Sequence, residues 1–425
     1  MIVEVLNTGS ELLLGKVVNA HLDYLAEQLF PLGLRISRQV TVPDGDAIRD
    51  GIVETFGRAD ILLVTGGLGP TTDDITREVT AELLGLDLVH DETVMRAISE
   101  RFHRRGLQLT ERVGRQAMKP EGAIVLPNDN GTAPGLYIEA REIAAGMADP
   151  AYATMTPHIF LLPGPPRELH PMFEESAIPI LRHIAPPPSE VTMRNYRIAG
   201  IGESLVEERV GESLLELGLE LGYCARPGEV EVRTIGDAEQ LAAARQIIVR
   251  NLGPHIISDD DRTLEQVLIE GLSARAETIA VAESCTGGYL ANRLTNVAGA
   301  SDAFVQGFVT YANKAKTRAL GVDEALIREH GAVSYEVAAA MAKGALNASG
   351  ATYALATTGI AGPGGGTEAK PVGTVFIAMA SKHRGAIVEH HLFVADRPTF
   401  KDYVAQTAFD MLRREMAGIA HGTAT

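Results

Sequence analysis

The sequence is poor in aromatic, sulfur-bearing and basic side chains. It has no tryptophan, aromatic residues make up 5% of its 425 positions, and its only cysteines are Cys224 and Cys285. Two cysteines cannot build a disulfide framework, which favours a reducing compartment. The 38 Lys and Arg residues stand against 55 Asp and Glu residues, so the formal net charge is −17. We therefore expect no nucleic-acid partner, because binding a phosphate backbone needs a concentrated positive surface.

Long apolar runs are missing as well. No uninterrupted apolar stretch approaches the roughly 20 residues that a membrane helix needs. The first residues, MIVEVLNTGSELLLG, indicate a strand and a turn and lack the basic and apolar regions of a signal peptide. We expect a cytoplasmic protein with no membrane partner.

The length and the order of the segments predict three domains. Over 1–183, strand-like and helix-like segments alternate, which predicts a mainly parallel sheet with helices on both faces. A surface excursion is expected at 141–157. A proline-rich linker at 183–191 leads to a small α+β unit at 190–257, and an acid-capped helix start opens the last domain, 258–420.

The segment TGGLGPTTDDITRE (65–78) follows a strand of the buried type. Glycines after a strand let backbone N–H groups approach an anion closely, and the start of a helix near Asp73 and Asp74 adds a favourable dipole. One carboxylate would suffice to cap that helix, so the second favours a divalent metal that bridges phosphate oxygens. The alternative is that Thr72 or Asp73 is only an N-cap.

Two other loops are expected at the same sheet edge, because ligands in such folds bind at the carboxyl ends of strands. GSELLLG (9–15) follows the first strand and carries Glu11. PNDNGTAPG (127–135) is rich in turn residues, and its amides suit sugar hydroxyls, although an ordinary surface turn has the same composition.

The segment AESCTGGYLANRLT (282–295) follows the first strand of the last domain. Ser284 is the expected N-cap or pre-cap of the next helix, whose bare first turn favours an anion. A helix N-terminus also lowers the pKa of a cysteine, so a thiolate nucleophile at Cys285 is one alternative. No histidine of the domain has an evident base role, which favours the commoner fate of a small buried cysteine.

The segment 299–322 carries the better candidates for chemistry. Asn313 is expected to cap a helix whose first turn holds Lys314 and Lys316, a position where the helix dipole disfavours cations. A lysine there with a lowered pKa can act as a general base and activate a serine hydroxyl. The alternative is two solvated lysines.

Three further features surround that segment. Tyr311 is placed to relay or donate a proton, and Ser301 precedes a strand and is expected to fold back over the site. Spacing alone does not choose between Ser301 and Ser284 as the nucleophile. The stretch ALATTGIAGPGGGTEAKPVGTV (354–375) carries six glycines, whose N–H groups suit an oxyanion hole or a phosphate, although a flexible loop has the same composition.

The chain resembles the CinA family (competence/damage-inducible protein A) over nearly its whole length. The resemblance rests on five segments in this order: TGSELLLG, TGGLGPTTDDITRE, PNDNGTAPG, LPGPPREL and AESCTGG. The resemblance implies an α/β fold: a doubly wound N-terminal domain like the molybdopterin-binding MoaB/MogA proteins, a small KH-like α+β middle domain, and an α/β deamidase domain. It implies two activities on small nucleotides: metal-dependent hydrolysis of ADP-ribose in the N-terminal domain, and deamidation of nicotinamide mononucleotide, without a cofactor, in the C-terminal one. It also implies a homodimer.

The motifs and the resemblance give two candidate sites. The N-terminal nucleotide site comprises Gly9, Glu11, Gly66, Gly67, Gly69, Thr71, Asn128, Gly131 and Thr132, with a divalent metal at Asp73 and Asp74. The C-terminal substrate residues are Cys285, Thr286, Gly287, Gly288, Asn313, Thr358, Gly359, Gly362 and Arg397, the last for the substrate phosphate. The family's catalytic serine–tyrosine–lysine group falls on Ser301, Tyr311 and Lys316, with Ser284 close to the reacting group. Asn7 departs from the family pattern.

The expected reaction begins with attack by Ser301 on the carboxamide carbon of nicotinamide mononucleotide, assisted by Lys316. Ammonia leaves, protonated through Lys316 or Tyr311, and water then hydrolyses the acyl-enzyme to nicotinate mononucleotide.

Two alternative functions stay open. One is a pterin- or molybdenum-cofactor-binding N-terminal domain, by fold analogy alone. The other is a non-enzymatic part in DNA uptake or repair. The turn GIGE (200–203) lacks the basic pair of an RNA-clamping KH loop.

Overall fold

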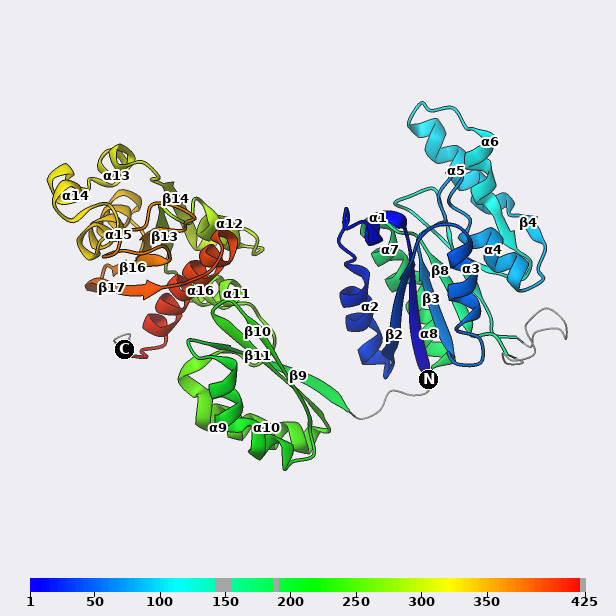
Figure 1. Cartoon of the computed structure of the whole chain (residues 1–425), viewed down its shortest axis with the longest axis horizontal. Helices are drawn as coiled ribbons and strands as arrows, with labels where there is room; N and C mark the ends of the chain where they lie inside the picture. The colour runs from blue at the N-terminus through cyan, green and yellow to red at the C-terminus, as the bar shows by residue number, and fades with distance from the viewer. Residues whose placement is uncertain (142–154, 186–190, 421–425) are drawn as a thin grey trace. The chain divides into compact units, whose positions relative to one another are not determined.

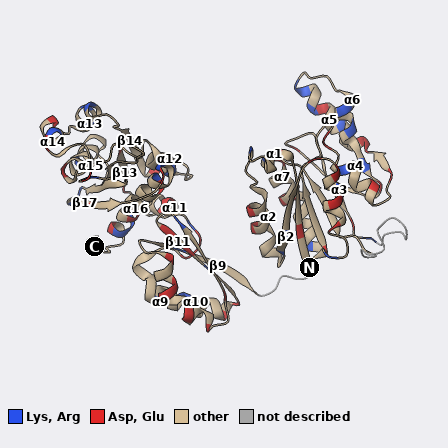
Figure 2. Ribbon diagram, in the orientation of Figure 1, with Lys and Arg blue, Asp and Glu red and all other residues tan. Residues whose placement is uncertain are grey.

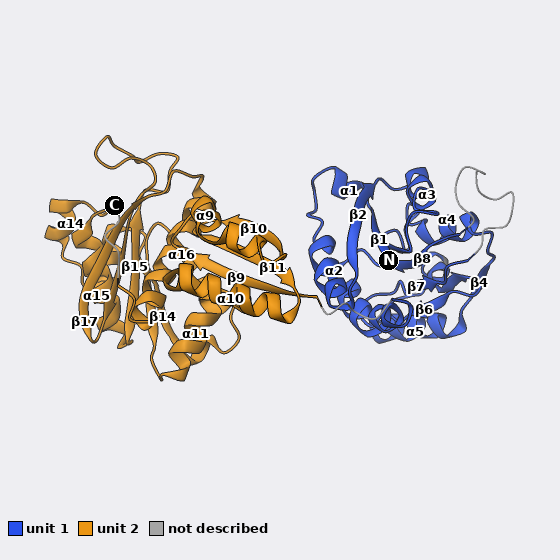
Figure 3. Ribbon diagram, turned by 90° about the horizontal axis from the view of Figure 1, so that it is seen from below, with its two compact units in different colours: residues 1–189 blue, residues 190–425 orange. Residues whose placement is uncertain are grey.

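The computed structural model describes residues 1–141, 155–185 and 191–420, and it divides into two compact units, 1–189 and 190–425 (Figure 3). The expected surface excursion at 141–157 and the linker at 183–191 lie largely outside the described residues. No helix within the described ranges is long and apolar enough to cross a membrane.

A sheet whose described strands run in the order β2-β1-β3-β8-β7-β6 forms the centre of unit 1 (Figure 1). The first four pair in parallel, and β7 and β6 extend the sheet antiparallel. The bounds of these strands are β1 Ile2–Thr8, β2 Arg35–Val42, β3 Ile61–Thr65, β6 Ile124–Leu126, β7 Gly135–Ile138 and β8 His158–Leu162. A separate antiparallel pair consists of β4 Leu88–His90 and β5 Met118–Pro120.

Helices cover both faces of this sheet, because alternate residues of its central strands point to opposite sides. Val3 and Val5 of β1 pack in one apolar cluster with Leu25, whereas Leu6 packs in another with Ile48. The helices are α1 Ser10–Leu13, α2 His21–Leu29, α3 Asp46–Val53, α4 Thr76–Leu83, α5 Glu92–Arg104, α6 Glu111–Gly114, α7 Pro166–Met172 and α8 Ile178–Ile184, with short turns η1 Phe30–Leu32, η2 Arg115–Ala117 and η3 Phe173–Ala177.

The first part of unit 2 is an antiparallel sheet with two helices on one face. Its strands lie in the order β10-β11-β9-β12, and α9 and α10 bury an apolar cluster against it that includes Tyr196, Val210 and Ile248. The bounds are β9 Thr192–Ala199, β10 Glu220–Arg226, β11 Glu229–Gly236, β12 Ile256–Ser258, α9 Glu203–Leu215, α10 Ala238–Leu252 and η4 Gly253–His255.

The second part of unit 2 is built on the sheet β14-β13-β15-β16-β17, in which the first three strands are parallel and the last two antiparallel. One apolar cluster holds α11, α12 and α16 on one face, and a second holds α14 and α15 on the other. The bounds are β13 Ile279–Glu283, β14 Phe304–Val309, β15 Tyr353–Gly359, β16 Thr374–Ser381, β17 Arg384–Leu392, α11 Leu264–Ala274, α12 Tyr289–Thr295, η5 Ala300–Asp302, α13 Asn313–Leu320, α14 Glu324–His330, α15 Tyr335–Ser349 and α16 Arg397–Met416.

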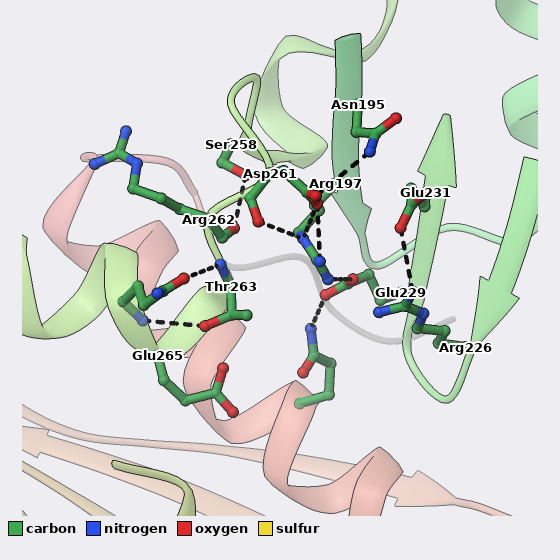
Figure 4. Close-up of polar contacts among 12 residues, drawn as sticks. Asn195, Arg197, Arg226, Glu229, Glu231, Ser258, Asp261, Arg262, Thr263 and Glu265 are labelled. Atoms are coloured by element: carbon green, nitrogen blue, oxygen red, sulfur yellow. Dashed lines mark hydrogen bonds and ion pairs between the residues drawn. The ribbon is translucent and has the colours of Figure 1, made fainter. Parts of the chain in front are cut away.

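Arg197 of β9 joins the two parts of unit 2 (Figure 4). Its Nη1 donates to Glu229 Oε1 at 2.7 Å, and its Nε donates to Asp261 Oδ1 at 3.0 Å. Glu229 Oε2 in turn accepts from Nε2 of Gln406 on α16 at 2.8 Å. Arg197 and Glu229 are both buried, so each charge depends on its partner for compensation.

Candidate functional site

Lys316 lies at the carboxyl ends of β13 and β14, with its amine turned inward. Its side chain is only 1% exposed. Nζ lies within hydrogen-bond distance of Ser284 Oγ at 3.0 Å, the Thr310 carbonyl at 2.9 Å and the Tyr311 carbonyl at 3.4 Å. The structure therefore brings Lys316 together with Ser284, the serine of the AESCTGG segment.

Burial favours the uncharged form of this amine. It lowers the pKa of Lys316 from its ordinary value of 10.5, because desolvation disfavours the charged form, and the neighbouring Cys285 opposes that shift to a smaller extent. Its hydrogen-bond partners are a hydroxyl and two carbonyls, all uncharged. A buried amine whose uncharged form is favoured, next to a hydroxyl, is the arrangement that a lysine general base needs.

The start of α13 differs from the expectation. Asn313 is the first residue of the helix and not its cap, because Ala312 holds the N-cap position without a side-chain hydrogen bond. Lys314 is exposed and Lys316 is buried, so only the second lysine belongs to the site. The difference in exposure between the two lysines follows from helix geometry, since residues two positions apart point to different faces of a helix.

Ser284 is not a helix cap, because α12 begins at Tyr289 and its N-cap is Gly288 in the left-handed region. The expected anion cradle at this helix is filled by Glu283, which is fully buried. The carboxylate of Glu283 accepts hydrogen bonds from three backbone N–H groups, those of Gly288 at 2.9 Å, Leu290 at 3.1 Å and Ala291 at 2.9 Å. The helix N-terminus is therefore satisfied by the chain itself.

Cys285 and Thr286, two of the predicted substrate residues, are buried. Burial raises the pKa of the Cys285 thiol to about 12, so the thiol is protonated near neutral pH. Thr286 is fully buried, and its Oγ1 lies 2.8 Å from Thr357 Oγ1. The two side chains hold the loop between β13 and α12, whereas Gly287, with a φ of 64°, gives that loop its turn.

A second group of predicted residues meets beside Tyr311, which is exposed. Arg397, the first residue of α16, donates from Nη2 to the Tyr311 hydroxyl at 2.8 Å and from Nη1 to the Gly362 carbonyl at 2.8 Å. Thr358 is buried instead, and its Oγ1 donates to the Ala332 carbonyl at 2.7 Å. Its neighbour Gly359 ends β15 in a half-buried position.

Ser301 lies at the other end of the sheet from Lys316. It is exposed in η5, before β14 begins, and the carbonyl of Ala303 accepts from the N–H of Ile279, the first residue of β13. Lys316 and Ser284 lie beyond the last residue of that parallel strand. A five-residue strand spans about 17 Å, so the expectation that Ser301 folds back over the amine is wrong for this chain.

The N-terminal candidates gather in one cleft of about 450 Å³ at the carboxyl ends of β1, β3 and β8. Nine predicted residues line it: Gly9, Glu11, Gly66, Gly67, Gly69, Asp73, Asp74, Gly131 and Thr132. Sequence reasoning missed other lining residues, namely Asp44, Arg101, Arg105, Gln116, Arg167 and Glu168. The run RFHRRG at 101–106 is a basic cluster in an acidic chain, and that contrast was the available signal.

Thr71 and Asn128 shape the loops of this cleft. Thr71 donates from its N–H at 2.9 Å, and from its hydroxyl, to Asp74 Oδ2. Asn128 Oδ1 accepts from the N–H groups of Asn130 at 3.0 Å and Gly131 at 2.6 Å. A Cβ at Gly69 would collide with the carboxylate of Asp74, so a side chain there would displace that carboxylate. The helix α4 begins at Thr76 after Ile75, hence neither Thr72 nor Asp73 is its N-cap.

The described residues contain no group of three or more His, Cys, Asp or Glu side chains that could hold a metal by themselves. Asp73 is exposed, so its carboxylate is solvated and charged at neutral pH. Mg²⁺ is typically bound through one or two carboxylates together with substrate phosphates. The pair Asp73 and Asp74 fits a metal that is shared with a phosphate-bearing ligand.

Asn7, the departure from the family pattern, is fully buried in β1. Its Nδ2 donates to Thr65 Oγ1 at 2.6 Å, and its Oδ1 accepts from Asn19 Nδ2 at 2.9 Å and Gln39 Nε2 at 2.6 Å. The side chain thereby ties β1 to β3, to β2 and to the segment before α2. A buried amide with all these partners is a structural residue.

Three family models match the chain: a probable molybdopterin binding domain over 4–183, the damage-inducible protein CinA KH domain over 193–251, and the CinA C-terminal domain over 261–416. A CinA-like protein of Akkermansia muciniphila is 45% identical over 96% of this chain and 95% of its own length. A putative competence-damage inducible protein of Caldicellulosiruptor bescii is 42% identical over 98% of this chain and 99% of its own length. The crystal structure of competence/damage inducible protein CihA from Agrobacterium tumefaciens is 39% identical, with a TM-score of 0.35, over 36% of this chain and 93% of that one.

Proposed function

Because the chain belongs to the CinA family, we propose that it is a bifunctional hydrolase of pyridine-nucleotide metabolism. The N-terminal domain has the MoaB/MogA-like fold, the middle domain is KH-like, and the last domain is the CinA C-terminal domain. In this proposal the last domain deamidates nicotinamide mononucleotide to nicotinate mononucleotide and ammonia. The N-terminal domain hydrolyses ADP-ribose with a divalent metal.

The contact between Lys316 Nζ and Ser284 Oγ, at 3.0 Å, carries the first activity. The neutral amine takes the proton of Ser284 as its oxygen attacks the carboxamide carbon. The bond from that carbon to the amide nitrogen then breaks, and the nitrogen takes the proton back from Lys316 and leaves as ammonia. Water, deprotonated by Lys316, hydrolyses the serine ester and restores the hydroxyl.

Arg397 and Tyr311 are the residues proposed to bind the substrate of the same reaction. The guanidinium of Arg397 is held by the Gly362 carbonyl and the Tyr311 hydroxyl, both at 2.8 Å. A guanidinium fits a phosphate through paired N–H donors, so Arg397 is the proposed contact for the phosphate of the mononucleotide. Wild-type protein incubated with nicotinamide mononucleotide is expected to release one ammonia for each nicotinate mononucleotide formed; no ammonia above a blank would remove the deamidase proposal.

The pH dependence of this activity follows from the lowered pKa of Lys316. The base works only when it is neutral, so kcat/KM for nicotinamide mononucleotide rises with pH through that pKa and levels off above it. We expect the midpoint of the rise below 10.5, the ordinary value for a lysine, and the same profile for Lys314→Ala. A rise centred at or above the ordinary lysine value would contradict the role of a buried base.

The cleft of unit 1 supports the second activity. The glycine loop 66–69 offers backbone N–H groups to phosphates, and Asp73 and Asp74 stand beside it. A divalent ion shared between these carboxylates and the substrate would neutralise phosphate charge. EDTA is expected to abolish ADP-ribose hydrolysis while ammonia release continues, since no metal is invoked in the last domain.

Asp73→Asn tests the same carboxylate without removing metal. The variant is expected to lower ADP-ribose hydrolysis at least ~10-fold, whereas the exposed control Asp87→Asn keeps wild-type rates. Equal rates for both variants, while EDTA still stops each of them from releasing AMP and ribose 5-phosphate, would place the metal elsewhere.

Other assignments have weaker support. Tight pterin binding without turnover of ADP-ribose would favour the molybdenum-cofactor alternative for the same cleft. A nucleic-acid partner for the KH-like domain is disfavoured by the GIGE turn at 200–203, which lacks the basic pair of an RNA-clamping loop, and by the net charge of −17. The homodimer stays a prediction from the family.

A further inference from the structure

The turn that follows α14 is held by side chains from another part of the last domain. Lys370, half-buried in the loop between β15 and β16, donates from Nζ to the His330 carbonyl at 3.1 Å and to the Val333 carbonyl at 2.6 Å. The carbonyl of Ala332, which lies between them in the sequence, accepts from Thr358 Oγ1 at 2.7 Å. Two segments that are distant in the sequence are thereby joined by three hydrogen bonds, two of them from one amine.

The loop that leads to Lys370 folds back on itself. The N–H of Thr367 donates to the Lys370 carbonyl at 2.9 Å, and the N–H of Lys370 donates to Thr367 Oγ1 at 3.1 Å. Val372 packs against two glycines of this loop, because a Cβ at Gly362 would lie 2.6 Å from Val372 Cγ1 and one at Gly366 would lie 2.7 Å from the Val372 nitrogen. The position of Gly362 therefore depends on the segment that Lys370 anchors.

Gly362 is the point at which this loop meets the proposed substrate site. It is buried, whereas residues 363–369 are exposed. Its carbonyl accepts from Arg397 Nη1 at 2.8 Å, and Nη2 of the same guanidinium donates to the Tyr311 hydroxyl at 2.8 Å. A shift of Gly362 would therefore move one of the two contacts that orient Arg397.

The orientation of this guanidinium matters because the protein as a whole repels anions. The formal net charge is −17, and Figure 2 shows acidic as well as basic residues on helices of both units. A phosphate-bearing ligand binds such a chain where cationic groups are held in place. An exposed loop that is rich in glycine has many conformations, and ordering the loop during binding weakens affinity. An anchor at Lys370 reduces that loss.

We propose that Lys370 is a positioning residue of the last domain. It fixes the loop 362–372 in the conformation in which the Gly362 carbonyl directs Arg397 toward the phosphate of a pyridine mononucleotide. The inference rests on the proposed function, since Arg397 is the phosphate contact proposed there. Lys370 acts through the loop and not on the ligand, so its loss weakens phosphate-dependent binding and leaves the chemistry of Lys316 and Ser284 intact.

The test compares Lys370→Met with wild type in the full chain, by calorimetry with nicotinate mononucleotide. This ligand is the proposed product, so it carries the phosphate and is not consumed. Nicotinate riboside, which lacks the phosphate, is the second probe. Lys343→Met is the matched control, because Lys343 is an exposed lysine of α15 in the same domain. Heat of binding that remains in Arg397→Gln is assigned to other sites of the chain.

We expect Lys370→Met to weaken the binding of nicotinate mononucleotide at least ~10-fold and to change the binding of the riboside less than about twofold. For nicotinamide mononucleotide, KM should rise by a similar factor, with kcat within about threefold of wild type. Adding Lys370→Met to Arg397→Gln should change kcat/KM less than about twofold, because the two residues act on the same contact. Lys343→Met should match wild type in every measurement.

Wild-type affinity of Lys370→Met for nicotinate mononucleotide overturns the inference, as does a wild-type protein that does not bind this ligand. A loss of kcat with an unchanged KM, or a further large loss in the double variant, also overturns it, since a merely structural role has that result. A wild-type protein that binds nicotinate mononucleotide, binds it weakly as Lys370→Met, and releases no ammonia from nicotinamide mononucleotide keeps the positioning role and removes the deamidase proposal.

Discussion

Replacing Lys316 with methionine is expected to reduce ammonia release from nicotinamide mononucleotide by about 10²–10⁴-fold, the usual contribution of a general base. Methionine keeps most of the buried volume and removes the group that accepts the proton of Ser284. Ser284→Ala should lower the rate of ammonia release by a similar factor. The double variant should be only slightly slower than either single variant, because the effects of residues that act as a unit do not add. KM should change less than kcat, since neither group is proposed to bind the phosphate.

The controls for this prediction come from the same segments. Lys314→Met changes the exposed lysine of α13 and is expected to keep wild-type activity. Cys285→Ala removes a buried thiol that is protonated near neutral pH, so it should affect stability more than turnover. Ser301→Ala is also expected to remain active. An inactive Ser301→Ala beside an active Ser284→Ala would exchange their roles and show that this edge of the domain is completed by residues from elsewhere.

Arg197→Met is expected to destabilise unit 2 by about 3–5 kcal/mol, the usual result of breaking a buried ion pair from one side. The substitution leaves the buried carboxylate of Glu229 without its positive partner, and it removes the bond to Asp261. Because the chain has no tryptophan, circular dichroism or calorimetry is the suitable measurement. The expected result is a lower midpoint for the transition of unit 2, with that of unit 1 unchanged.

Arg194→Met provides the comparison on the same strand. Arg194 is exposed, and surface substitutions of this kind usually change stability by no more than about 0.5 kcal/mol. Equal midpoints for the two variants would mean that the ion pairs of Arg197 do not hold the middle domain to the last one. In that case the packing of Gln406 and its neighbours would carry the junction.

Much of this architecture could be predicted from the sequence, because it depends on patterns that are local. Buried strands such as 61–65, ending in glycines, placed the N-terminal cleft at a sheet edge, and nine predicted residues line that cleft. Lys316 was found for a similar reason, since its place in the first turn of a helix is a local property. The fold class agrees with the family models.

The features that could not be predicted depend on tertiary contacts between segments that are distant in the sequence. Spacing in the sequence did not choose between Ser301 and Ser284, and only the parallel register of β13 and β14 puts the two serines at opposite ends of the sheet. Glu283 was read as the end of a strand, although its side chain reaches three N–H groups of the next helix. Arg101 and Arg105 lie on a helix with no glycine motif, and they enter the cleft only through the packing of α5.

The carboxylate of Glu283 has a consequence for the turnover of substrate. Where the loop before a helix becomes ordered only on binding a phosphate, the loop loses conformational entropy. That loss weakens the binding of each ligand molecule. In this chain the carboxylate of Glu283 takes the place of the phosphate and holds the loop in the folded protein. In the proposed reaction, the loop that carries Ser284 is therefore held in place by the chain's own hydrogen bonds before a ligand binds.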